Sequence, residues 1–84
     1  MGNVDEKVKE VLLEILDVKP ENIVPTASFI DDLNATSIDI VEILTALQNA
    51  FDVNITDEEA EKIGTVQDAV NFLNAAIARK EAKT

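Results

Sequence analysis

The clearest helical pattern in the chain is the stretch TSIDIVEILTALQNAF, residues 36–51. At about 100° per residue, its large apolar side chains gather on one side of a helical wheel. This apolar arc comprises Ile40, Val41, Ile43, Leu44, Leu47 and Phe51, and the opposite side comprises Asp39, Glu42, Thr45, Ala46 and Asn49. The stretch therefore predicts an amphipathic helix with one buried face. Ile38 departs from the pattern, because it lies on the polar side, next to Ser37 at the helix start.

Three predicted helix starts, including that of the stretch just described, share a second pattern, in which a threonine stands three residues before an acid. The pairs are Thr36 with Asp39, Thr56 with Glu59, and Thr65 with Asp68. Each hydroxyl and each carboxylate can accept a hydrogen bond from an exposed backbone N–H, which is typical of a helix N-terminus. The pairs predict helices over residues 37–51, over about 57–63 before Gly64, and from residue 66 onward. A first helix is predicted over about residues 4–17, with Asn3 as its candidate cap, because apolar residues recur there at intervals of three and four.

These elements predict an all-α fold, a four-helix bundle with three longer helices, one short third helix and a long loop between the first two helices. The loop, residues 18–35, contains two prolines, and we expect its apolar side chains to pin it to the bundle. These side chains are Ile23, Val24, Phe29, Ile30 and Leu33. Residues 1–84 are expected to form a single domain, with an ordered core over about 3–78 and a frayed tail at 79–84.

The composition excludes several classes of function. The chain has 84 residues and contains no Cys, His, Trp or Tyr, which removes disulfides, the usual zinc and haem ligands, and imidazole or thiol catalysis. A calcium loop beginning at Asp32 also fails, because Ser37 stands where such a loop needs Gly and Ile43 where it needs Glu. The sequence therefore predicts no metal site and no enzyme.

The net charge of −10 has the wrong sign for a surface that binds nucleic acid or an anionic membrane. Residues 29–68 alone contain ten acids and one base. Two interpretations remain open, a solvated face that keeps the protein soluble and a surface that steers basic partners. The first residues carry acids where a secretion signal needs positive charge, and no apolar run could span a membrane, so we expect a cytoplasmic monomer.

Ser37 lies at the expected start of the second helix, where backbone N–H groups and the helix dipole favour a negative group such as a phosphate ester. The simpler interpretation is that Ser37 or Thr36 only caps the helix. Ser37 is a poor nucleophile in its own right, because the chain has no His to act as a base. Any chemistry at Ser37 is therefore expected to be performed by another enzyme.

Several segments carry a resemblance to a known family. They are ASFIDDL at 27–33, Ser37-Ile38-Asp39 with Val41-Glu42, Ala46-Leu47, Phe51-Asp52, DEEAEKI at 57–63 and Thr65-Val66-Gln67. From Val8 to about Leu73 the sequence resembles the acyl carrier proteins of bacterial fatty-acid synthesis. The resemblance implies that Ser37 receives a covalent 4′-phosphopantetheine arm, transferred from coenzyme A by a phosphopantetheinyl transferase. Acyl intermediates of fatty-acid or related lipid or polyketide biosynthesis would then be carried as thioesters on the thiol of the arm.

The resemblance also implies roles for other residues. Docking to basic patches of acyl-loading and acyl-processing enzymes is assigned to Ile38, Asp39, Glu42, Asp57 and Glu58. A sleeve for the acyl chain is assigned to Phe29, Val41, Leu47 and Ile63. No residue is expected to be catalytic.

Some positions depart from the pattern of the family. Thr36 precedes the serine where the family has Asp, and Asn34 stands where a Gly is common and can itself tolerate a left-handed turn. Thr45 replaces a typical Met, and residues 48–50 are neutral where the family usually has acids. Thr36 keeps an alternative open, in which the chain is an acidic interaction or regulatory module that resembles a carrier and is never modified.

Overall fold

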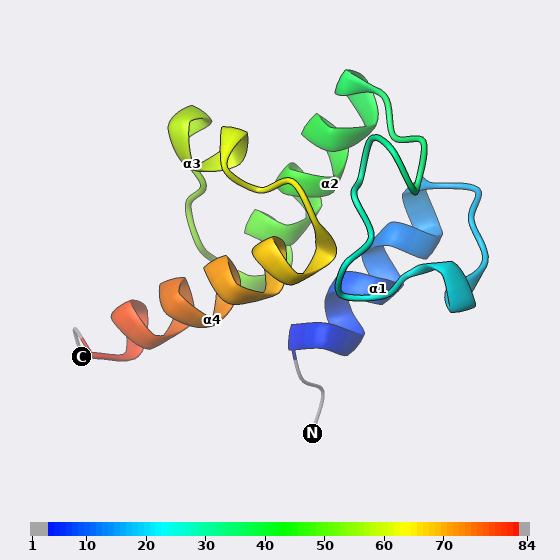
Figure 1. Cartoon of the computed structure of the whole chain (residues 1–84). Coiled ribbons are helices and arrows are strands. Elements are labelled where there is room, and N and C mark those ends of the chain that lie inside the picture. Colours follow the sequence, from blue (N-terminus) through cyan, green and yellow to red (C-terminus); the bar gives the residue numbers. More distant parts are fainter. Residues whose placement is uncertain (1–3, 83–84) are drawn as a thin grey trace.

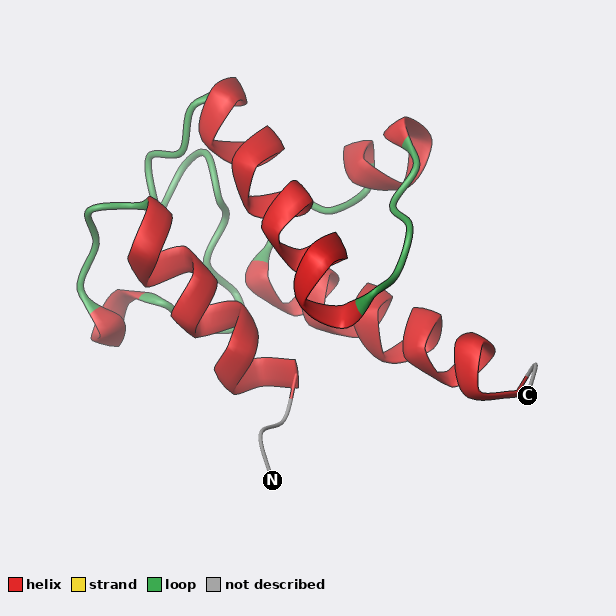
Figure 2. Cartoon of the chain, turned by 180° about the vertical axis from the view of Figure 1, so that it is seen from behind, coloured by secondary structure: helices red, strands yellow, loops and turns green. Residues whose placement is uncertain are grey.

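The computed structural model describes residues 4–82 of the chain, and within this range it consists of helices joined by loops. The elements are α1 (Val4–Ile15), a 3₁₀ turn η1 (Pro20–Asn22), α2 (Ser37–Phe51), α3 (Asp57–Glu61) and α4 (Val66–Ala82). α1 packs against both α2 and α4, while α3 lies apart and is joined to the bundle by a loop at each end (Figures 1 and 2). The predicted all-α architecture with a short third helix is confirmed.

The predicted threonine caps are present at three helix starts. Thr36 Oγ1 accepts a hydrogen bond from Asp39 N at 3.1 Å, and Asp39 Oδ2 accepts one from Thr36 N at 3.0 Å. Thr56 and Glu59 make the same reciprocal pair at 3.2 and 3.0 Å, and Thr65 and Asp68 make it at 3.2 Å in both directions. Asn3, the predicted cap of α1, lies outside the described residues.

Helix ends differ from the predicted ones by a few residues. α1 ends at Ile15 rather than near residue 17, and α3 ends at Glu61 rather than near residue 63. The expectation that the chain frays from residue 79 is wrong for residues 79–82, since α4 continues to Ala82. Lys80 Nζ pairs with Asp52 Oδ2 at 2.9 Å, so the last turns of α4 are attached to the end of α2. Basic side chains in the last turn also suit the negative end of the helix dipole.

The core is apolar throughout the described residues. It joins α1, α2, α4 and the long loop, through Val8, Leu12, Phe29, Leu33, Ile43, Leu47 and Leu73 among others. Ile23, Phe29 and Leu33 pin the loop as predicted, but Val24 and Ile30 are 43% and 62% exposed. The prediction was wrong for Ile30 because the loop turns sharply there: Ser28 O accepts hydrogen bonds from the N–H groups of both Asp32 and Leu33. The turn buries Phe29 and Leu33 and leaves Ile30 outside.

Candidate functional site

Ser37 is the first residue of α2, and its side chain is exposed. The cap of the helix is Thr36, so Ser37 is not the capping residue and its hydroxyl is available for another use. The first N–H of α2 to bond a backbone carbonyl is that of Ile40, which donates to Thr36 O at 3.0 Å. The N–H groups at Ser37 and Ile38 therefore have no intrahelical partner and point toward the helix start.

The turn before Ser37 is held by a backbone hydrogen bond and by buried side chains. Asn34 has a positive φ of 56°, the left-handed conformation that the sequence allowed for it. Ala35 N donates to Phe29 O at 2.8 Å, and the side chains of Leu33 and Ala35 are both buried. Ser37 is thus presented from a turn that is fixed to the core.

A groove of about 480 Å³ runs between α2 and α3 and includes Ser37. Its α2 side is formed by Ser37, Ile40, Val41, Leu44, Thr45 and Gln48. Its α3 side is formed by Ile55, Asp57, Ala60, Glu61, Ile63 and Gly64, and Ile30 of the long loop also lines the groove. The groove is apolar along much of its length and has carboxylates on the α3 side.

Three of the four predicted sleeve residues, Phe29, Leu47 and Ile63, are buried. Phe29 and Ile63 line a cavity of about 10 Å³ together with Ile40, Ile43 and Leu44. Ile40, Leu44 and Ile63 also line the groove, so these three residues separate the cavity from the groove beside Ser37. A cavity of this volume holds one water molecule at most, and the interior is therefore closed.

Val41 does not lie on the buried side of α2, and its prediction as a buried residue was wrong. It is 62% exposed and lines the groove rather than the interior. The helical wheel placed Val41 on the apolar arc, but at this position α2 borders the groove rather than the core. Leu47 is fully buried but lines neither the groove nor the small cavity.

The predicted docking residues lie on α2 and α3. Ile38 is 71% exposed and Glu42 is exposed, whereas Asp39 is half-buried and uses one carboxylate oxygen in the cap of α2. Asp57 and Glu58 are both exposed at the start of α3, and Asp57 lines the groove. The structure therefore brings Ser37, Val41, Asp57 and Ile63 together in one groove, while Ile38, Asp39, Glu42 and Glu58 lie outside it.

Ile30 was missed as a site residue by sequence reasoning. It is an exposed apolar side chain on the loop and lines the same groove as Ser37. Its neighbours Ser28 and Asp32 gave a usable signal, because short polar residues at this spacing form turns with their own backbone. Ser28 N indeed donates to Asp32 Oδ2 at 2.6 Å.

Glu59 has a perturbed carboxyl group at the start of α3. The hydrogen bond from Thr56 N lowers the pKa of Glu59 below its ordinary value, and the Thr56 hydroxyl and the charges of Arg79 and Lys62 act in the same direction. Burial opposes this shift, but the pKa remains lowered overall. The ionised form of Glu59 therefore stabilises the N-terminus of α3.

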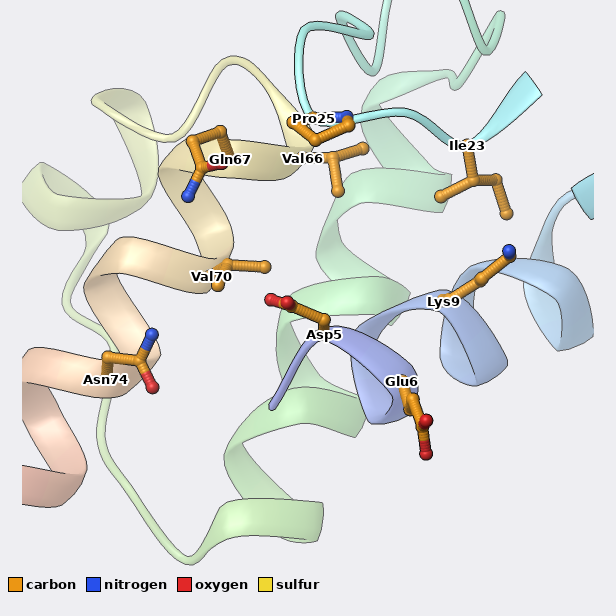
Figure 3. Close-up of a pocket in the computed structure, with 9 residues that line it drawn as sticks. All are labelled: Asp5, Glu6, Lys9, Ile23, Pro25, Val66, Gln67, Val70 and Asn74. Atoms are coloured by element: carbon orange, nitrogen blue, oxygen red, sulfur yellow. The ribbon is translucent and has the colours of Figure 1, made fainter. Parts of the chain in front are cut away.

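A second groove, of about 440 Å³, lies between α1 and α4. Figure 3 shows that Asp5 of α1 points toward Val70 of α4, Lys9 points toward Ile23 of the loop, and Glu6 points away from α4. The remaining residues that line this groove are Pro25, Val66, Gln67 and Asn74. None of the predicted site residues lines it.

The chain is similar to known proteins over most of its length. A family model described as a phosphopantetheine attachment site matches residues 6–73. The acyl carrier protein of Buchnera aphidicola subsp. Schizaphis graminum is 47% identical over 74 residues, which cover 88% of this chain and 94% of that protein. The chain belongs to the acyl carrier protein family. Acyl carrier proteins are carriers rather than catalysts, and their cofactor is a covalently bound 4′-phosphopantetheine.

Two further acyl carrier proteins are similar to the chain. One, from Buchnera aphidicola subsp. Acyrthosiphon pisum (strain Tuc7), is 52% identical over 73 residues, covering 87% of this chain and 91% of that protein. The other is a solved structure of acyl carrier protein from Enterococcus faecalis, with a TM-score of 0.76 and 34% identity over 87% of this chain and 92% of that chain. No helix within the described residues is long and apolar enough to cross a membrane.

The described residues fit a phosphopantetheine group. The Ser37 hydroxyl is exposed and is not the helix cap, and the unpaired N–H groups at the start of α2 suit the negative charge of a phosphodiester. The groove beside Ser37 is open to solvent and partly apolar, and its carboxylates lie on the α3 side rather than at the start of α2.

Proposed function

We propose that Ser37 is the attachment residue for 4′-phosphopantetheine and that the chain carries acyl intermediates in fatty-acid or related lipid or polyketide biosynthesis. One observation supports this most strongly. Thr36 takes over the capping of α2, so an exposed serine hydroxyl is left at the first position of the helix, directly beside the groove. A capping role for Ser37 would have explained the serine without any modification.

The attached group supplies the thiol that holds the acyl chain as a thioester, and the protein has no cysteine of its own. The residues of the chain provide the place of attachment and its surroundings. Ser37 Oγ bears the phosphodiester, and the N-terminal N–H groups of α2 stabilise its negative charge. The fixed turn at Asn34 and Ala35 keeps the position of the hydroxyl constant.

Ile38, Asp39, Glu42, Asp57 and Glu58 are proposed to dock basic patches of a phosphopantetheinyl transferase and of acyl-loading and acyl-processing enzymes. Ile38 supplies an exposed apolar contact, and the exposed carboxylates supply charge around it. Complementary charge at such a rim raises the rate of association and selects partners. The net charge of −10 favours a monomer that binds neither nucleic acid nor anionic membranes, and a cytoplasmic location is part of the proposal.

Phe29, Val41, Leu47 and Ile63 are proposed to surround an acyl chain. Val41 would contact the chain in the groove, and Phe29 and Ile63 would contact it in the interior. The interior cavity of about 10 Å³ is too small for an acyl chain, so entry requires α2 and α3 to separate. The groove side of this path is already formed by Ile40 and Leu44.

The test is the intact mass of the protein after incubation with coenzyme A and a phosphopantetheinyl transferase of broad specificity. The chain contains only two serines, so Ser28→Ala is a matched control for Ser37→Ala. We expect one phosphopantetheine increment on the wild type and on Ser28→Ala, and none on Ser37→Ala. An increment that persists on Ser37→Ala would refute the site, and no increment on the wild type with several transferases would favour the unmodified interaction module.

A further inference from the structure

Gln48 organises the chain segment that follows α2. Its backbone carbonyl accepts hydrogen bonds from Asp52 N and from Val53 N, the latter at 3.1 Å. Its side-chain Oε1 accepts a further hydrogen bond from Ile55 N at 3.1 Å. Its Nε2 donates to Leu44 O, one turn earlier on α2, at 3.3 Å. Three backbone N–H groups of residues 52–55 therefore donate hydrogen bonds to Gln48, a single half-buried residue of α2.

α3 has few other attachments to the bundle. None of its five residues, Asp57–Glu61, is buried. On its far side the chain is attached again by the buried side chain of Ile63 and by Phe29 N, which donates to Gly64 O at 3.1 Å. Figure 2 shows the short helix between these two loops. α3 is thus held mainly at its two ends. At the first end the Gln48–Ile55 hydrogen bond acts together with the half-buried side chains of Val53 and Ile55, which pack against the core.

Gln48 and Ile55 also line the groove that contains Ser37. Any widening of the groove toward the cavity at Phe29 and Ile63 moves the α3 side away from α2. Because residue 55 leads directly into α3, such a movement strains or breaks the Gln48–Ile55 hydrogen bond. A stronger Gln48–Ile55 hydrogen bond therefore makes opening of the groove less frequent.

We propose that Gln48 is a positioning residue that holds the start of the α3 segment against α2 and so sets how often the groove beside Ser37 opens. The use of this opening for an acyl chain rests on the proposed function, but the opening itself does not. A glutamine is suited to the position, because its amide accepts from Ile55 N and donates to Leu44 O at the same time. A glutamate keeps only the acceptor, and a leucine keeps neither.

The first test measures amide hydrogen exchange, residue by residue, on the unmodified full chain. In Gln48→Leu we expect exchange at residues 55–61 to be about 2- to 13-fold faster, which is the range for the loss of one ordinary hydrogen bond. Gln48→Glu retains the acceptor and is expected to keep most of the protection. Gln67→Leu is the matched control, since the side-chain Nε2 of Gln67 donates to Asn71 Oδ1 at 2.9 Å within α4 and joins no two elements, while the backbone bond of Gln67 N to Pro25 O is kept in the variant.

The second test measures opening of the groove itself. Because the chain has no cysteine, Ile63→Cys introduces a single thiol at a buried position between groove and cavity. We expect iodoacetamide to react with this thiol about 2- to 13-fold faster when Gln48→Leu is added, and at a nearly unchanged rate when Gln67→Leu is added.

Three results would overturn the proposal. They are unchanged exchange at residues 55–61 in Gln48→Leu, equal acceleration in Gln48→Glu and Gln48→Leu, and acceleration spread evenly over α1, α2 and α4. Neither test requires Ser37 to be modified, so a failure here is distinct from a failure to attach phosphopantetheine.

Discussion

The two sides of the groove beside Ser37 are built differently. The Ser37 side rests on α2 and on the turn at residues 28–35, where Phe29, Leu33 and Ala35 are buried and the backbone is hydrogen-bonded to itself. The α3 side has no buried residue within its helix and is attached mainly at its ends. The difference shows how a small carrier can fix the proposed attachment residue and leave the opposite side of the groove free to move.

The largest expected effect comes from weakening the fixed side. Phe29→Ala removes a buried aromatic side chain and should lower the free energy of unfolding by about 3–5 kcal/mol, measured by urea denaturation followed by circular dichroism. A small domain has about 5–15 kcal/mol in total, so the variant should be marginally stable. A loss below about 1 kcal/mol would mean that the turn at residue 29 is not part of the cooperative core.

A matched pair of cap variants compares the two sides directly. Thr36→Ala removes the cap of α2 and should lower the free energy of unfolding by about 1 kcal/mol. Thr56→Ala removes the same cap from α3, but because α3 opens locally, its effect on global unfolding should be smaller and its main effect should be faster amide exchange at residues 57–61. Equal losses of global stability in the two variants would contradict the claim that the α2 side is more firmly held than the α3 side.

Docking should depend on charge next to Ser37 rather than on charge elsewhere. Glu42→Lys is expected to raise the KM for the phosphopantetheinyl transferase about 3-fold at low salt and less at high salt, with kcat little changed. Glu14→Lys on the exposed side of α1 makes the same change in net charge and should leave KM unaltered. Glu42 is a better site for this test than Asp39, whose carboxylate also caps α2. Similar KM values for the two variants would show that only net charge matters.

The smallest expected effect is the loss of stabilisation of α3 at acidic pH, when Glu59 becomes protonated. The pKa of Glu59 is lowered in the folded protein, so the stabilisation it gives to α3 is complete above the ordinary glutamate pKa and is lost as the pH falls through the lowered value. Nuclear magnetic resonance titration should therefore show the side-chain carboxyl signal of Glu59 changing at a pH below the ordinary glutamate pKa. In Glu59→Gln this transition should be absent, and a wild-type transition at or above the ordinary pKa would contradict the assignment.

Much of the fixed side could be predicted from the sequence. The threonine–acid pairs located three helix starts, and the apolar spacing identified Ile43 and Leu47 as buried residues of α2. Asn34 was expected to tolerate the left-handed conformation that it adopts. These features are local, since each depends on residues within about one helical turn.

The rest depended on contacts between distant segments. Val41 was predicted to be buried, but only the length and position of α3 determine whether that edge of α2 is covered. Ile30 was counted as an anchor of the loop, whereas the turn at Ser28 directs it into the groove. The extension of α4 to Ala82 accompanies the contact of Lys80 with Asp52, which lies 28 residues earlier. No local pattern carries this information.

The central claim is that the groove has one fixed side and one movable side. Residue-resolved amide hydrogen exchange on the unmodified wild type tests it most directly, by comparing Ala35 and Ile43 with Ile55 and Ala60. We predict that the first pair exchanges only through global unfolding, and that the second pair exchanges at least about 10-fold faster through local opening. Equal protection of the two pairs would contradict the account, because α3 would then be as firmly held as α2.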